Sequence, residues 1–185
     1  VRAQVPTPVP TGNFDARVAQ AVPLTALPDR APNGVIQSFA AGRPNLAVTV
    51  DDTFGVTSKL YDRLGYLTAP DPRDASTIAL EFIEANLAVL GLDPADLAEY
   101  EVSDLVVNQA TGSTHLYLRQ TFQGIALYNG LLHVNINRDG RIMSVNNAWV
   151  RGLAGVVNAA APAWNAGDAV ASAAASLNLA TVAPP

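Results

Sequence analysis

The sequence predicts an α+β fold in which one long helix packs on a four-stranded antiparallel sheet. Between residues 74 and 90, apolar side chains recur at steps of three and four, which is typical of an amphipathic helix. Between residues 100 and 150, short runs alternate apolar and polar side chains, which is typical of half-buried strands. With 185 residues, 49% of them hydrophobic and 15% charged, the chain is long and apolar enough to bury a core.

Residues 1–70 are predicted to form an extended N-terminal region that is rich in proline. Three prolines lie in Val1–Thr11, which favours a loosely held extended arm. The alternation in Leu46–Val50 predicts one short strand. Asp51 and Asp52 follow it, and we interpret them as solvated carboxylates, because a calcium site needs six or more oxygen ligands at set spacing.

The clearest helix runs from Pro72 or Asp74 to Leu90. Asp74 can cap its N-terminus, and Gly91 can end it in the left-handed conformation. One apolar stripe is formed by Ala75, Ile78, Ala79, Phe82, Ile83, Leu87 and Leu90. A short turn starting at Asp93-Pro94 and a strand over Tyr100–Asn108 are expected to follow.

Three further strands are predicted in Gly112–Val150. Thr114–Phe122 alternates and leads into a tight turn at Gln123-Gly124. Asp139-Gly140 predicts a type I′ hairpin turn, because both residues tolerate positive φ. The resulting register pairs Ile136 with Met143, Asn135 with Ser144, Val134 with Val145 and His133 with Asn146.

The core candidates of the middle strand change parity along its length. Ile125 and Leu127 are odd-numbered, whereas Leu132, Val134 and Ile136 are even-numbered, so one regular strand cannot bury both sets. We therefore predict a β-bulge or break at Asn129-Gly130, where glycine permits an irregular backbone.

Composition and motifs exclude several function classes. The net charge is −5 and Lys59 is the only lysine, so there is no basic patch for nucleic acid or an anionic membrane. No cysteine, His-Glu-x-x-His motif or Gly-x-Ser-x-Gly elbow is present. Two histidines alone, His115 and His133, do not make a metal site. We therefore expect no catalytic residue, no metal site and no cofactor in this chain.

The polar side of the last hairpin is the candidate site. Short amides and hydroxyls there can form hydrogen bonds with a partner at a small cost in side-chain entropy. The candidate residues are His133, Asn135, Asn137, Ser144 and Asn146, with Tyr128 and Trp149 as possible aromatic anchors. The alternative is an ordinary solvated sheet face, and both aromatic residues would also suit a core.

The string Gly112, Thr114-His115-Leu116, Leu118-Arg119-Gln120, Gly124-Ile125, Leu132, Val134, Asp139-Gly140-Arg141 and Ser144-Val145 resembles the fungalysin/thermolysin propeptide domain. It is most similar to the propeptides of secreted fungalysin-type zinc metallopeptidases. Phe14-Asp15-Ala16-Arg17 is similar to a Phe-Asp-x-Arg string near the start of those propeptides; the alternative is a surface turn with a local pair of Asp15 and Arg17. Ala126-Leu127 departs from the family, which often has Pro-Val there.

The resemblance implies a cystatin-like fold and a division of the chain into three parts. Residues 71–152 would form the propeptide-like domain, and residues 153–185 a linker and the first helix of a truncated PepSY-like domain. That helix is the Ala-rich stretch Asn165–Leu179.

The resemblance also implies a function. Such a segment would be a secreted, non-catalytic intramolecular chaperone and inhibitor, which is removed when the peptidase is activated. Its partner would be the catalytic domain of its own precursor, which would hold the zinc. The alternative is a freestanding secreted cystatin-like binding or inhibitor module.

Overall fold

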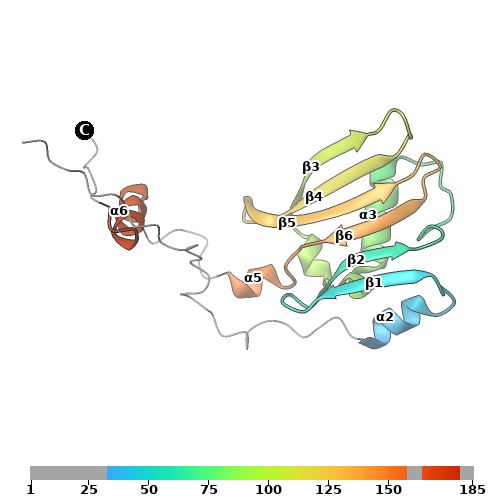
Figure 1. Cartoon of the computed structure of the whole chain (residues 1–185), viewed down its shortest axis with the longest axis horizontal. Helices are drawn as coiled ribbons and strands as arrows, with labels where there is room; N and C mark the ends of the chain where they lie inside the picture. Colours follow the sequence, from blue (N-terminus) through green and yellow to red (C-terminus); the bar gives the residue numbers. More distant parts are fainter. Residues whose placement is uncertain (1–32, 158–163, 180–185) are drawn as a thin grey trace, which may run out of the picture.

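The computed structural model of the protein describes residues 33–157 and 164–179. A six-stranded antiparallel sheet has the strand order β1-β2-β6-β5-β4-β3, and α3 lies across one of its faces (Figure 1). The elements are α2 (Asn33–Ala40), β1 (Leu46–Asp51), β2 (Val56–Asp62), α3 (Ala75–Ala85), α4 (Leu87–Leu90), η2 (Pro94–Leu97), β3 (Tyr100–Val107), β4 (Thr114–Phe122), β5 (Ile125–Ile136), β6 (Ile142–Asn147), α5 (Leu153–Val156) and α6 (Ala166–Ser176).

The predicted α+β class holds, but the predicted cystatin-like arrangement of one long helix on four strands is wrong. β1 and β2, from the region predicted to be extended, enlarge the sheet to six strands. β2 joins it by pairing Lys59 with Asn146, Leu60 with Val145 and Tyr61 with Ser144. This strand was missed because its alternation runs without a break into the apolar and aromatic residues that follow it.

The long helix is interrupted at Asn86. The backbone N–H of Asn86 donates to the carbonyl of Ile83, and the Asn86 Nδ2 donates to the carbonyl of Phe82 at 2.7 Å. An asparagine side chain competes in this way with helical backbone bonds, which explains the break between α3 and α4. The predicted ends are confirmed: Asp74 accepts from the Thr77 N–H at 2.9 Å, and Gly91 has a φ of 76°.

The core lies between α3 and the sheet. Ile78, Ala79 and Ile83 of α3 are buried, as are the even-numbered apolar residues of the strands that it covers. Those strand residues are Leu116, Leu118, Leu132, Val134 and Ile136. The odd-numbered residues of β5 near its C-terminal end therefore point to the opposite face.

The register of the β5–β6 hairpin is confirmed for three of its pairs, His133–Asn146, Val134–Val145 and Asn135–Ser144. The predicted type I′ turn is wrong, because Gly140 has a positive φ and Asp139 does not. Instead, the Asn137 Oδ1 accepts from the N–H groups of Asp139 and Arg141. This side-chain capping tightens the turn, and Ile136 pairs with Ile142 instead of Met143.

The break predicted at Asn129-Gly130 is confirmed. Asn129 has a φ of 60°, and the pairing of β4 with β5 shifts between Arg119 and Thr121. Beyond the break, Ile125 pairs with Phe122 as predicted, but its side chain is 61% exposed instead of buried. Ile125 lies at the tip of the hairpin, outside the core.

The predicted Ala-rich helix is present as α6, which Asn165 caps by accepting from the Asp168 N–H. None of its residues is buried, and it lies apart from the sheet (Figure 1). Its relation to a PepSY-like domain remains a prediction. Val1–Thr11 and Phe14–Arg17 lie outside the described residues. Among the helices that the structure describes, none is long and apolar enough to cross a membrane.

Candidate docking face

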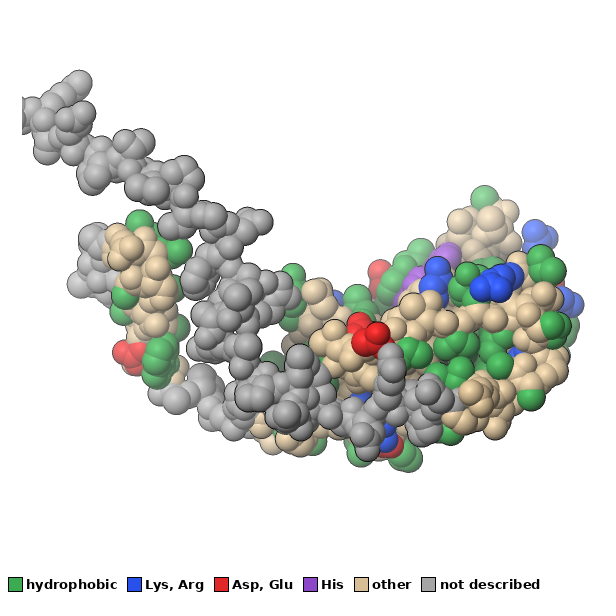
Figure 2. Space-filling view, turned by 60° about the horizontal axis from the view of Figure 1, so that its bottom comes forward, with side chains coloured by type: hydrophobic (Ala, Val, Ile, Leu, Met, Phe, Trp, Pro, Cys, Tyr) green, Lys and Arg blue, Asp and Glu red, His purple; other side chains and the backbone are tan. Residues whose placement is uncertain are grey.

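The sheet face opposite α3 carries a continuous array of polar and aromatic side chains, which we call the polar face. Cross-strand partners point to the same side of a sheet, so the pairing defines two rows across β2, β6, β5 and β4. One row is Lys59, Asn146, His133 and Tyr117, and the other is Tyr61, Ser144, Asn135 and His115. Figure 2 shows histidine side chains at the surface, beside basic ones.

Hydrogen bonds fix the second row. Asn135 Nδ2 donates to Ser144 Oγ at 2.9 Å, which leaves Asn135 Oδ1 as the acceptor for His115 Nδ1 at 2.5 Å. This assignment places a proton on His115 Nδ1. The second ring nitrogen of His115 lies 3.4 Å from Ser113 Oγ. The side chains of Ser144, Asn135 and His115 are therefore held in place before any partner binds.

In the first row, His133 and Tyr117 are held together by ring stacking. The rings of His133 and Tyr117 are parallel within 5°, with centroids 4.1 Å apart. Burial lowers the pKa of His133, the nearby His115 lowers it further, and Asn135 partly opposes both effects. His133 Nε2 is buried and has no hydrogen-bond partner among the described residues. This environment favours the neutral imidazole.

The structure brings together four of the seven predicted docking residues, His133, Asn135, Ser144 and Asn146. The other three lie elsewhere. Asn137 shapes the β5–β6 turn, and Tyr128 is 90% exposed in the bulge of β5. Trp149 is completely buried, where its Nε1 donates to the carbonyl of Leu118 at 3.2 Å.

Sequence reasoning left four members of the polar face out of the site. Lys59 and Tyr61 were missed with β2. The signal for these two residues in the sequence was that they flank the apolar Leu60 in an alternating pattern. His115 and Tyr117 were placed on the correct face of their strand, but the pairing that brings them beside His133 was not followed across to β4.

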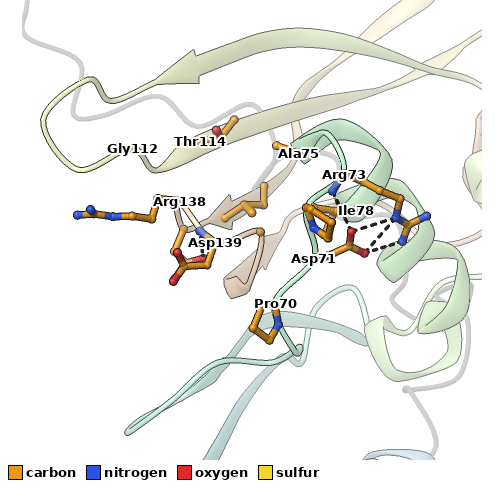
Figure 3. Close-up of a pocket in the computed structure, with 13 residues that line it drawn as sticks. Pro70, Asp71, Arg73, Ala75, Ile78, Gly112, Thr114, Arg138 and Asp139 are labelled. Carbon is orange, nitrogen blue, oxygen red and sulfur yellow. Dashed lines mark hydrogen bonds and ion pairs between the residues drawn. The ribbon is translucent and has the colours of Figure 1, made fainter.

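A hollow of about 460 Å³ lies between the start of α3 and the β5–β6 turn (Figure 3). Its charged groups do not converge. The Arg73 guanidinium forms ion pairs with Asp71 and Glu81, both at 2.7 Å, and Arg138 extends away from the hollow. In the described part of the chain, no three His, Cys, Asp or Glu residues are grouped to hold a metal.

Residues 98–148 match the family model of the Fungalysin/Thermolysin Propeptide Motif. This range contains β3, β4, β5 and β6, so six of the eight residues of the polar face lie within the match. The chain carries a fungalysin/thermolysin propeptide motif. The resemblance inferred from Gly112–Val145 is thereby confirmed.

Extracellular metalloproteinases of fungi also match. Extracellular metalloproteinase 5 of Arthroderma otae is 30% identical over 101 residues, which are 52% of this chain and 16% of that protein. Probable extracellular metalloproteinase 5 of Trichophyton verrucosum is 28% identical, and that of Arthroderma benhamiae 27%, with the same coverage. The chain thus spans about a sixth of the length of these relatives.

Proposed function

We propose that this chain is the propeptide of a secreted zinc metallopeptidase, which helps the catalytic domain to fold and inhibits it until the propeptide is removed. The match of residues 98–148 to the propeptide motif carries the proposal. The names of the relatives, extracellular metalloproteinases, support secretion and a metallopeptidase partner. The zinc and the catalytic residues would belong to that partner.

Physical chemistry gives such a segment a role in folding. A protease that is protected by a high unfolding barrier can also be slow to fold, because both rates depend on the same transition state. A separately folded template that binds this transition state accelerates folding and can then be removed. Its own stable core, between α3 and the sheet, allows it to act as a template.

We assign the polar face as the docking surface for the catalytic domain. Hydrogen bonds hold three side chains of its second row, and a ring stack holds two of its first row. A partner that binds this face therefore orders few additional side chains, which lowers the entropic cost of binding.

The proposed function is tested by titrating the purified chain against the peptidase portion of the same precursor. We expect a dose-dependent loss of peptidase activity, direct binding, and a higher yield of active enzyme when the denatured peptidase is refolded with the chain. A well-folded chain without any of these effects would contradict the proposal and favour a freestanding binding module.

The docking assignment has its own test in the variant Asn146→Arg. A large charged side chain in the first row should weaken binding at least about tenfold, which corresponds to about 1.4 kcal/mol. Gln37→Arg places the same side chain on an exposed position of α2 and should leave the affinity unchanged. Equal affinities of the two variants would exclude the polar face as the contact.

A further inference from the structure

β3 forms one edge of the sheet, and within residues 33–157 and 164–179 no strand pairs with its outer side (Figure 1). Every residue of β3 after Tyr100 is exposed. Val102, Leu105, Val106 and Val107 are 54%, 48%, 44% and 49% exposed. Exposed edge strands in soluble proteins usually carry lysine, proline or inward-pointing charges that block further pairing, and β3 has no lysine or proline.

Three of these exposed apolar residues, Val102, Leu105 and Val107, form a strip on the side of the sheet that α3 covers. Val102 pairs with Leu118, and Leu105 pairs with Leu116, and both partners are completely buried. α3 packs on β4 and β5. The core face of the sheet therefore continues onto β3 but is left uncovered there.

At the opposite edge of the sheet, which β1 forms, the apolar side chains are covered. In β1, Leu46 and Val48 pack against the core. α2 lies on that side of the sheet, and its Val35 and Phe39 also pack against the core (Figure 1). The exposed apolar strip is thus specific to β3.

We infer that β3 pairs with an extended segment from the peptidase portion of the same precursor, which adds a seventh strand to the sheet. This inference rests on the proposed function and names a contact for it. Backbone hydrogen bonds to the open edge would supply affinity, and apolar side chains of the added strand would cover the Val102 and Leu105 strip.

Charge favours this partner over a second copy of the chain. β3 contains Glu101 and Asp104 and no basic residue, so pairing of two copies would place four carboxylates on one ladder. Arg119 of β4 lies 3.6 Å from Glu101, whereas no ion pair is formed by Asp104 among the described residues. A partner strand with a basic side chain opposite Asp104 would be complementary.

The position of β3 also suits a contact that extends the polar face. Asp104 pairs with Tyr117 and Val106 pairs with His115, so these two residues of β3 continue the two rows beyond β4. The chain spans 16% of the length of its relatives, so most of such a precursor lies outside it and can supply the strand. One partner could contact both the edge and the face.

The test combines hydrogen exchange with a pair of matched variants, using this chain and the separately produced peptidase portion. We expect the backbone amides of residues 101–107 to become protected in the complex. Leu105→Lys should weaken binding at least about tenfold while leaving the melting temperature within about 2 °C of the wild type. Ile125→Lys, which changes an exposed apolar residue at the hairpin tip, should leave the affinity unchanged. If Leu105→Lys does not fold, Val107→Lys replaces it.

Three results would overturn the inference. In the first, the complex forms, the β3 amides remain unprotected and Leu105→Lys binds normally, so the proposed function stands without this contact. In the second, the wild-type chain neither binds nor inhibits the peptidase, which removes the proposed function itself. In the third, sedimentation shows a dimer of the chain that Leu105→Lys dissociates, which makes a second copy the occupant.

Discussion

Gly140 connects the β5–β6 turn to the start of α3. Its φ is 72°, and a Cβ at this position would overlap the carbonyl oxygen of Asp71. The Asp71 N–H donates to the Asp139 carbonyl at 3.0 Å, so two backbone segments lie in direct contact here. The Asp139-Gly140 pair, read from the sequence only as a hairpin turn, therefore also sets the position of the helix that covers the sheet.

Gly140→Ala should destabilise the chain through both effects. Positive φ costs a non-glycine residue about 1 kcal/mol or more, and the overlap with Asp71 adds about 1–3 kcal/mol. Gly42→Ala is the matched control, because Gly42 has a φ of 76° and no atom near its Cβ position. Denaturant unfolding of both variants measures the difference. Equal losses of stability would mean that the hairpin and the helix can separate at no cost.

Gln120 is a buried polar residue at a core position of β4. It is 1% exposed, its Nε2 donates to the Val150 carbonyl at 2.9 Å, and its Oε1 accepts from the Val150 N–H at 2.8 Å. The amide thus pairs with the backbone as a neighbouring strand would, and it holds the segment that follows β6.

Gln120→Leu should lower the free energy of unfolding by about 1–3 kcal/mol, because it removes both hydrogen-bond partners of the backbone of the half-buried Val150. Gln37→Leu, at an exposed position of α2, makes the same chemical change without losing such bonds and should be nearly neutral. Urea denaturation checks both variants. A neutral Gln120→Leu would show that water replaces the lost hydrogen bonds.

At the scale of the element, the polar face should make stability depend on pH. Burial and His115 lower the pKa of His133 from its usual value near 6.5. The folded chain then binds fewer protons at this site than the unfolded chain. The contribution of His133 to the stability is therefore fully present above pH 6.5 and is lost as the pH falls through the lowered pKa. Asp71 and Asp74 also have lowered pKa values, but from 3.8, so their contribution changes in a more acidic range.

We therefore expect the denaturant concentration at the unfolding midpoint to decrease as the pH is lowered from about 7.5 to about 5. The decrease should be smaller in His133→Gln. Unfolding curves across this range measure both slopes. An unchanged slope in His133→Gln would assign the pH dependence to other groups. A slope of the opposite sign would mean that folding stabilises the protonated imidazole.

Elements were predictable from the sequence where one local pattern was decisive. The caps Asp74 and Gly91, the bulge at Asn129-Gly130 and the pairing of Val134 with Val145 all depend on neighbouring residues, and all are confirmed. The failures depend on contacts that are distant in sequence. Pairing with β6 defines β2, and the side-chain hydrogen bonds of Asn86 and Asn137 override the expected helix and turn.

The same limit applies to the candidate site. The residues on the β5–β6 hairpin could be read from alternation and turn position, because the hairpin is local. The contribution of β2 and β4 requires the strand order of the whole sheet. The exposed apolar strip of β3 was also invisible in the sequence, since Leu105 has the same local pattern whether or not a helix covers it.

At the scale of the whole molecule, the described chain divides into a packed unit and a helix outside it. Trp149 is completely buried, and beyond it Arg151 forms an ion pair with Asp93 at 2.9 Å, while the Gly152 N–H donates to Asp96 at 2.7 Å. These contacts close the packed unit at α5. No residue of α6 is buried, so α6 contributes no core to it.

Two shortened chains test this division. A chain that ends at Val157 lacks α6 but keeps every contact of the packed unit, so its melting temperature should stay within about 2 °C of that of the full chain. A chain that ends at Ala148 lacks Trp149, whose loss should cost at least about 3–5 kcal/mol, and cooperative melting should disappear or shift far downward. Calorimetry of the two chains measures the contrast. A large loss of stability on removal of α6 alone would show that this helix packs on the sheet in solution. The apolar strip of β3 would then be the first candidate for that contact.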